Sequence, residues 1–313
     1  MTAADLSCPS PGADGKTLVF VHIPKAGGTT LHAILERQYA PAVTWRCDMQ
    51  QHGDLQRFLA LPPRQRDAVR CLRGHLPFSL CALLPRPAAC VTLLREPVQR
   101  FVSQYSHCRR NPANAEAIGF PRERTRTLED YIELEIERHG INLQTRLIGG
   151  YLDLQRPEPP FDPLPADALD TAKRNLHTHF LAAAPVERFD EFLVLMKRLL
   201  GWRCFAYTRR NIDPAASAAR PLPPALAERV RELHHLDREL FRFVRVRFEQ
   251  QVREQGAGFQ REVERLRRRA ALLHGLQTLY NRPSLLRLRR RARRACRSLA
   301  PPQDATNQDR TPR

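Results

Sequence analysis

The chain has 313 residues, of which 42% are hydrophobic, which is enough for a globular core in one large domain or two small ones. Lysine and arginine outnumber the acids by 51 to 33, so the formal net charge is +18, and no run of 18 apolar residues is present to span a membrane. The eight cysteines are scattered without a CxxC pair, which excludes the usual metal-site spacing, and we expect free thiols.

The most informative segment is residues 18–31, LVFVHIPKAGGTTL. Its apolar beginning predicts a strand over 17–22, and apolar positions from Leu31 onward predict a helix over 29–39. A strand, a glycine loop and a helix N-terminus together point backbone N–H groups at an anion. The candidate anion-binding residues are Pro24, Lys25, Ala26, Gly27, Gly28, Thr29 and Thr30. A plain glycine-rich turn is the structural alternative.

A histidine follows the next apolar stretch, where a strand is predicted over 68–73. Open α/β sheets place active sites at the carboxyl ends of strands, and the unperturbed pKa of histidine lies near neutrality. His75 is therefore the candidate general base. A loop histidine that only caps the strand is the alternative. The competing histidines are His22, which is expected to pack or hydrogen-bond locally, His52 and His107.

A second strand-to-helix junction lies in residues 91–105, VTLLREPVQRFVSQY. A strand is predicted over 89–94 and a helix over 98–109. Arg95 at the strand end and Ser103 two helical turns on could both face one ligand, since guanidinium is a forked, permanently charged donor and serine adds a neutral one. The alternatives are an arginine paired with a nearby glutamate and a solvated serine.

The position of the lysine separates the first loop from ordinary nucleotide loops. In GxxxxGK[ST] the lysine follows the last glycine, whereas Lys25 precedes both glycines. This order resembles the 5′-phosphosulfate loop of sulfotransferases that use 3′-phosphoadenosine 5′-phosphosulfate (PAPS). The resemblance is strongest to the branch containing heparan sulfate 2-O-sulfotransferase and bacterial relatives, whose loop reads close to HIPKTGGTT. Ala26 departs from that pattern and removes one hydroxyl. Arg95 and Ser103 resemble the family's 3′-phosphate-binding residues, and the Gly-His pair at His75 resembles its catalytic segment.

The resemblance implies an α/β fold with a P-loop-like parallel sheet flanked by helices and a helical C-terminal extension. It implies PAPS as co-substrate, no metal, and sulfuryl transfer to a hydroxyl of an acceptor, expected to be a carbohydrate or glycolipid. His75 would take the acceptor proton, Lys25 would steady the leaving phosphate oxygen, and Arg95 with Ser103 would hold the 3′-phosphate. The alternatives are an ATP-dependent small-molecule kinase and a non-enzymatic polyanion-binding protein.

The rest of the chain predicts mainly helices. These cover 53–60, 127–138, 140–149, 166–177, 190–200 and 223–250, with a strand at 180–184 and loops at 111–126 and 151–165. Asn142 and Arg146, one turn apart in a stretch that resembles the family's NxQTR motif, either help bind acceptor or nucleotide or form a structural network. The expected organisation is a flexible N-terminus 1–16, a sulfotransferase domain 17–255, a basic helical extension 256–299 and a disordered tail 300–313.

The extension carries most of the excess charge. Residues 261–313 contain 15 arginines and four acids, and apolar residues from Leu285 to Leu299 step by three and four. Such a helix is typical of contact with a membrane surface or a polyanion, and a solvated helix packed on the domain is the alternative. An acidic polysaccharide or anionic lipid would fit this charge, and no nucleic-acid motif accompanies it.

The expected location is the cytoplasm. The first 17 residues lack the basic start and apolar stretch of a secretory signal. The eukaryotic enzymes that the chain resembles are anchored in the Golgi membrane, and no such anchor is visible here. We therefore expect a bacterial, cytoplasmic enzyme whose basic helix allows peripheral contact with the inner membrane face.

Overall fold

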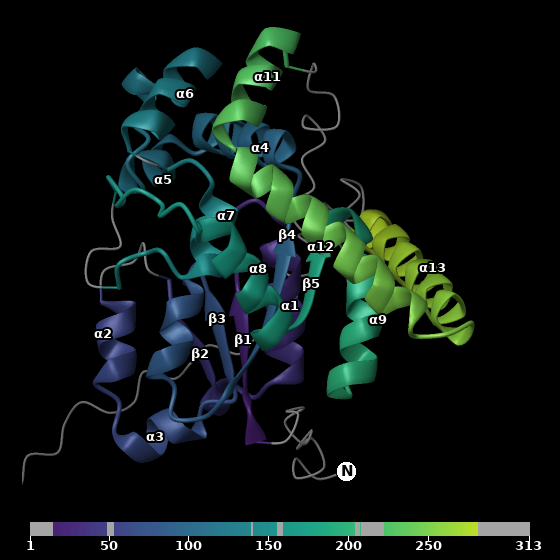
Figure 1. The fold of residues 1–313 in the computed structure, drawn as a ribbon. Coiled ribbons are helices and arrows are strands. Elements are labelled where there is room, and N and C mark those ends of the chain that lie inside the picture. The colour runs from purple at the N-terminus through teal and green to yellow at the C-terminus, as the bar shows by residue number, and fades with distance from the viewer. Residues whose placement is uncertain are drawn as a thin grey trace, which may run out of the picture.

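The computed structural model contains a five-stranded sheet with helices packed around it (Figure 1). It describes residues 15–48, 53–138, 140–154, 159–203, 207 and 222–280. The strands are β1 (Thr17–Val21), β2 (Thr44–Arg46), β3 (Cys71–Gly74), β4 (Ala88–Leu94) and β5 (Phe180–Pro185). They all run parallel, in the order β2-β3-β1-β4-β5. The predicted α/β class, a parallel sheet flanked by helices, is confirmed.

The helices surround the sheet and extend beyond one end of it. Their bounds are α1 (Gly28–Gln38), α2 (Asp54–Leu59), α3 (Pro63–Ala68), α4 (Pro97–Arg110), α5 (Pro112–Ala117), α6 (Leu128–Glu137), α7 (Leu143–Gly149), α8 (Ala168–His179), α9 (Phe189–Leu200), α11 (Pro224–Leu233), α12 (His235–Arg253) and α13 (Gly258–Tyr280). Figure 1 shows α7, α8 and α12 in front of the sheet, and α4, α5, α6 and α11 gathered at the top. None of the helices in the described part of the chain has the length and apolarity needed to cross a bilayer.

The order of the strands brings four strand ends together at one edge. Val21 pairs with Gly74 on one side and with Thr92 on the other, and Arg46 pairs with Arg73. The segments that follow β1, β2, β3 and β4 therefore start side by side. Open α/β sheets bind ligands at this carboxyl edge, where the chain order reverses between neighbouring strands.

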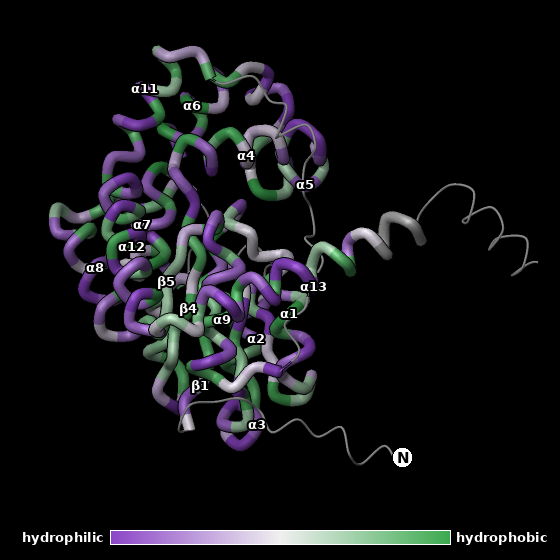
Figure 2. Tube along the Cα trace, turned by 90° about the vertical axis from the view of Figure 1, so that its right-hand side faces the viewer, coloured by the Kyte–Doolittle hydropathy of each residue, from purple (hydrophilic) through white to green (hydrophobic). Residues whose placement is uncertain are grey.

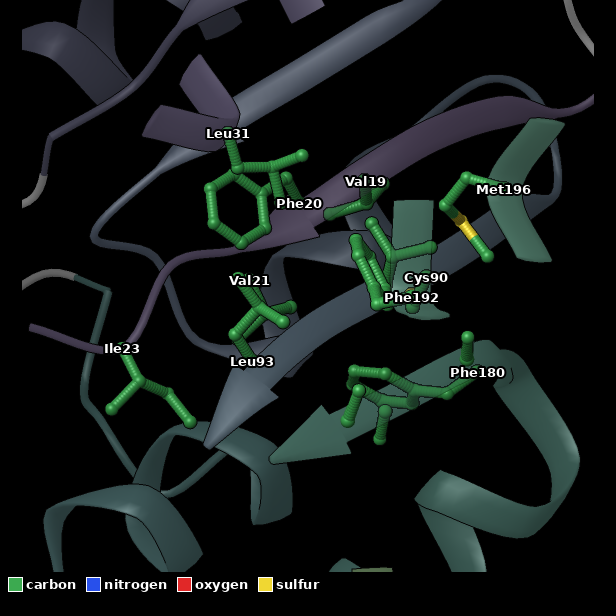
Figure 3. Packing of buried hydrophobic residues seen from close by; sticks show 14 of the residues in the cluster. Val19, Phe20, Val21, Ile23, Leu31, Cys90, Leu93, Phe180, Phe192 and Met196 are labelled. Carbon is green, nitrogen blue, oxygen red and sulfur yellow. The ribbon is translucent and has the colours of Figure 1, made fainter. Parts of the chain in front are cut away.

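The core lies on both faces of the sheet, which explains the continuous apolar strands in the sequence. All residues of β1 are buried. Figure 3 shows Val19 and Phe20 of β1 in one apolar cluster with Leu31 of α1 and Phe192 of α9. In Figure 2 the strands are largely green whereas the helices alternate between green and purple, as expected for helices that bury one face.

Local sequence signals explain where α4 and α6 begin. The Glu96 carboxylate accepts a hydrogen bond from the Gln99 backbone N–H, and Pro97 occupies the first turn of α4, where no hydrogen is needed. At α6, Thr127 and Asp130 form a capping box. Both helices thus start within a residue of their predicted positions.

The prediction misses several short elements. Strand β2 spans three residues of a sheet edge, none of them fully buried, and so has no apolar run to reveal it. Helices α3 and α5 start with a proline in the first turn, and α5 lies inside the predicted loop 111–126. The predicted helix 223–250 is two helices, which meet at buried His234, and α7 starts at Leu143 rather than 140.

The beginning of the predicted basic extension packs on the domain. In α13, Val263 and Leu266 are buried, and Glu262 accepts a hydrogen bond of 2.7 Å from Nζ of Lys197 on α9. The apolar stripe 285–299, the tail 300–313 and residues 1–14 lie outside the described residues. The free cysteines are Cys47, Cys71, Cys81, Cys90 and Cys108; the other three also lie outside the described residues.

Candidate functional site

The loop between β1 and α1 has the backbone of an anion-binding turn. Lys25 and Gly27 both adopt left-handed conformations, with φ of 66° and 79°. This conformation costs a non-glycine residue about 1–2 kcal/mol, so the fold holds Lys25 against its local preference. Helix α1 starts at Gly28, and its N-cap, Gly27, has no side chain to cap the first turn. The first N–H groups of α1 therefore form the positive end predicted to face the anion.

The other predicted loop residues divide between core and surface. Ala26 is fully buried, and its methyl group joins the hydrophobic core. Thr29 is exposed, Thr30 is nearly buried and Pro24 is half-buried. A Cβ on Gly27 would lie 2.7 Å from Cγ2 of Val186, so space as well as backbone conformation requires glycine there. Of the predicted threonine hydroxyls, that of Thr29 lies on the exposed side of the loop.

His75 is paired with a buried carboxylate that the sequence analysis did not select. His75 follows β3, and its Nδ1 lies 3.1 Å from Oδ2 of Asp48, which follows β2. An ionised carboxylate only accepts hydrogen bonds, so Nδ1 carries the proton and Nε2 is left with a lone pair. Asp48 therefore fixes both the ring and the tautomer that a general base needs.

His22 lies against His75 and heads a chain of polar contacts. The two rings are stacked, with centroids 4.3 Å apart. Nδ1 of His22 lies 3.0 Å from Nε2 of His32, and Nδ1 of His32 lies 3.0 Å from an Nη atom of Arg73. Arg73 also donates to Glu36 at 2.8 Å. The expectation that His22 packs and hydrogen-bonds locally describes these contacts.

Burial and positive neighbours keep His22 and His32 neutral. Burial first, and then the charges of His75 and His32, hold the pKa of His22 well below its usual value. Burial and the Arg73 guanidinium lower the pKa of His32 to about 3. Both rings are therefore uncharged at neutral pH.

Arg95 connects the loop between β1 and α1 to helix α7. Its Nη1 donates to the backbone oxygen of Lys25 at 3.3 Å. Gln144 clamps its backbone from the other side: Oε1 accepts from the Arg95 N–H at 3.0 Å, and Nε2 donates to the Arg95 oxygen at 2.9 Å. Nε of Arg95 is buried and has no hydrogen-bond partner among the described residues. A guanidinium with an unused buried N–H fits an anionic ligand at this position.

A buried carboxylate from α12 holds Gln144 in turn. Asp237 accepts hydrogen bonds from the backbone N–H groups of Gln144 and Thr145, at 3.2 and 2.7 Å, and from Oγ1 of Thr145 at 2.8 Å. Asp237, Gln144 and Thr145 are completely buried. This carboxylate satisfies the N-terminal donors of α7, as an N-cap would. Helix α12 thus fixes α7, and α7 fixes Arg95.

Ser103 and His107 share one face of α4 because they are four residues apart. Burial, and then the charge of Lys25, lower the pKa of His107. Both ring nitrogens of His107 are engaged: Nδ1 lies 3.2 Å from Nδ2 of Asn111, and Nε2 lies 3.3 Å from Oδ1 of Asn114. His107 is therefore a weaker candidate base than His75. His52, the other competitor, lies outside the described residues.

Asn142 and Arg146 belong to buried structural contacts. Asn142 donates its backbone N–H to Nδ1 of His234 at 3.1 Å, and its side chain accepts from the Asp237 N–H at 3.1 Å. Arg146 donates to the backbone oxygen of Asp162 at 2.7 Å and lies over the ring of Phe161. Both side chains are at least 97% buried. Of the two alternatives that the sequence left open, these contacts favour the structural network.

Comparison with known proteins gives a family for this arrangement. Residues 13–160 match the family model described as "Sulfotransferase family". The chain is 29% identical over 290 residues to galactose-3-O-sulfotransferase 3 of Bos taurus and 28% identical over 285 residues to that of Homo sapiens. Each match covers 84% of this chain, and the chain spans 65% and 64% of the relatives' lengths. The family model and both relatives therefore support a sulfotransferase.

A solved structure was also matched, that of mouse sulfotransferase SULT7A1 complexed with PAP. The match has 13% identity and a TM-score of 0.38, and it covers 71% of this chain and 66% of the other. The two curated relatives are named for galactose. Membership of the heparan sulfate 2-O-sulfotransferase branch therefore stays a prediction.

Proposed function

We propose that this chain transfers the sulfuryl group of PAPS to a hydroxyl of a carbohydrate. The observation that carries the proposal is the His75–Asp48 pair, which meets the β1–α1 anion loop at one edge of the sheet. The match of residues 13–160 to the sulfotransferase family model supports PAPS rather than ATP as donor. The names of the matched relatives make a galactose hydroxyl, free or in a glycolipid, the first acceptor to test.

The residues divide the reaction between them. The acceptor hydroxyl gives its proton to Nε2 of His75 as its oxygen attacks sulfur, and the bond between sulfur and the bridging phosphate oxygen breaks. Lys25 and the N-terminus of α1 steady the negative charge on the leaving phosphate. Arg95 and Ser103 hold the 3′-phosphate. Positioning and charge stabilisation supply most of the catalysis, as in phosphoryl transfer.

Calorimetry with 3′,5′-adenosine bisphosphate (PAP) tests the donor. We expect binding without magnesium and its loss in Arg95→Ala. His75→Ala should still bind PAP but lose about 10²–10⁴-fold in turnover, measured as radiolabelled sulfate transfer to galactosides and glycolipids. Preference for ATP with magnesium would indicate a kinase instead, and heparin binding without nucleotide affinity would indicate a polyanion-binding protein.

The location and the role of the basic extension are part of the same proposal. We infer a cytoplasmic enzyme of bacterial origin that uses its basic helix for peripheral contact with anionic lipid or an acidic polysaccharide. The exposed arginines Arg265, Arg268 and Arg269 of α13 support the contact with an anionic partner. Sedimentation of the full chain with vesicles, with and without anionic lipid, tests the lipid contact, and retention on a heparin column tests the polysaccharide contact.

A further inference from the structure

The chain of contacts from Arg73 to His22 determines where each imidazole carries its proton. Arginine has donors only, so the Arg73 guanidinium donates to Nδ1 of His32. That nitrogen is an acceptor, and neutral His32 therefore carries its hydrogen on Nε2. Nε2 of His32 then donates to Nδ1 of His22 across 3.0 Å. His22 in turn carries its hydrogen on Nε2.

The protonated nitrogen of His22 is aimed at the N-terminus of α1. A Cβ on Gly28, the first residue of α1, would overlap the His22 imidazole, and Nε2 would be the nearest atom. His22 is 9% exposed, and its Nε2 has no hydrogen-bond partner among the described residues. The His22 side chain is thus nine-tenths buried, and its unpartnered N–H beside the helix N-terminus is available to an acceptor.

We propose that His22 is a neutral hydrogen-bond donor to an oxygen of the 5′-phosphate held at the N-terminus of α1. The inference rests on the proposed function, because it takes the ligand of this loop to be PAPS or PAP. His22 is then a binding and positioning residue that touches the co-substrate. Its tautomer is fixed by Arg73, whose guanidinium acts on His22 through His32.

The two stacked histidines, His75 and His22, then have opposite hydrogen-bonding roles. Asp48 places the proton of His75 on Nδ1 and leaves Nε2 free to accept, as a base must. Arg73 and His32 place the proton of His22 on Nε2, where it can only donate. Burial, which holds the pKa of His22 low, keeps it from becoming a second charged group beside the base. Proton transfer and phosphate binding are therefore separated between adjacent rings.

Nitrogen NMR of the wild-type chain tests the tautomers directly. With ¹⁵N-labelled histidine at pH 7, His22 and His32 should both show hydrogen on Nε2, and His75 should show it on Nδ1. Addition of PAP should shift the Nε2–H signal of His22 without changing its tautomer. Hydrogen on Nδ1 of His22, or a charged His22 ring, would overturn the proposal.

Matched variants test the contact with the ligand. The amide nitrogen of glutamine reaches about as far as Nε2 of histidine, and that of asparagine reaches only as far as Nδ1. His22→Asn should weaken PAP binding about tenfold, and His22→Gln should retain most of it. Adenosine 3′-monophosphate, which lacks the 5′-phosphate, should bind all three proteins equally.

The outcomes separate this inference from the function on which it rests. If the wild type does not bind PAP, the proposed function fails. If the wild type binds PAP and folded His22→Asn binds it equally well, only the role of His22 is refuted. Equal losses for PAP and adenosine 3′-monophosphate would show a general structural effect and would also refute it.

Discussion

The clamp of Gln144 on Arg95 predicts that a residue of α7 controls nucleotide affinity. Gln144→Met keeps the volume of this completely buried side chain but removes both hydrogen bonds to the Arg95 backbone, of 3.0 and 2.9 Å. The Arg95 N–H and carbonyl then lose this partner at the end of β4. An unsatisfied buried group costs about 1–3 kcal/mol. Because Arg95 is only half-buried, we expect about 2–3 kcal/mol for the pair rather than the maximum.

Part of that loss should appear in PAP binding. Without the clamp, the backbone that carries the Arg95 side chain gains freedom, while the guanidinium keeps its contact with the Lys25 oxygen, so binding must also immobilise Arg95. We expect PAP affinity to fall about tenfold, which corresponds to about 1.4 kcal/mol. Calorimetric titration with PAP measures the affinity, and urea unfolding measures the stability.

Thr145→Val is the matched control. Thr145 is the next residue of α7, is equally buried, and loses one hydrogen bond of 2.8 Å to Asp237 on substitution. Among the described residues its side chain has no direct hydrogen bond to Arg95; it contacts Asp237, which binds the backbone of Gln144 and leaves the side-chain amide of Gln144 on Arg95. It should lose stability, by about 1–2 kcal/mol, and keep wild-type PAP affinity. The reasoning is refuted if Gln144→Met is destabilised but binds PAP as tightly as Thr145→Val does.

Three further predictions concern Asp48 after β2 and two residues of α1, Gly28 and His32. Asp48→Asn should leave PAP binding intact and lower sulfate transfer about 10²-fold or more, because His75 loses the partner that fixes its tautomer. Unchanged turnover would show that Asp48 has no part in the mechanism. Gly28→Ala should weaken PAP binding at least tenfold in a folded protein, because its methyl would displace the His22 ring; circular dichroism and calorimetry check this, and unchanged affinity would contradict it. His32 alone should lower the stability of the wild type by about 2 kcal/mol from pH 6.5 to 5, because unfolded His32 binds a proton there while the folded ring, with a pKa of about 3, does not; the lowered pKa of His22 adds to this fall. Urea unfolding of His32→Gln should show a shallower slope over that range, and an identical slope would assign the loss to other groups.

The residues that lie next to one another in sequence could be predicted, because local signals determine them. The apolar runs before Pro24, His75 and Arg95 mark three strands, and parallel strands bring their carboxyl ends to one edge. The lysine-first loop and the Arg95 segment were placed correctly within this edge.

The partners of these residues could not be predicted, because strand order and helix packing supply them. Asp48 stands 27 residues before His75, and the only clue was a three-residue edge strand whose half-exposed residues carry no apolar signal. Had that strand been recognised, its end would have pointed to Asp48. Gln144 meets Arg95 across 49 residues through a side-chain amide, and no periodicity in the sequence encodes such a contact.

The second glycine of the loop shows how structure changes the meaning of a motif. From sequence, Gly28 is a place where backbone approaches an anion. In the fold, its missing Cβ is also the space that the His22 imidazole occupies, six residues earlier in the chain. Histidine at 22 and glycine at 28 are therefore a matched pair: a larger residue at 28 removes the ring, and a smaller residue at 22 leaves a gap beside the N-terminus of α1. The loop HIPKAGGTT then contains its own side-chain donor in addition to its lysine and its backbone.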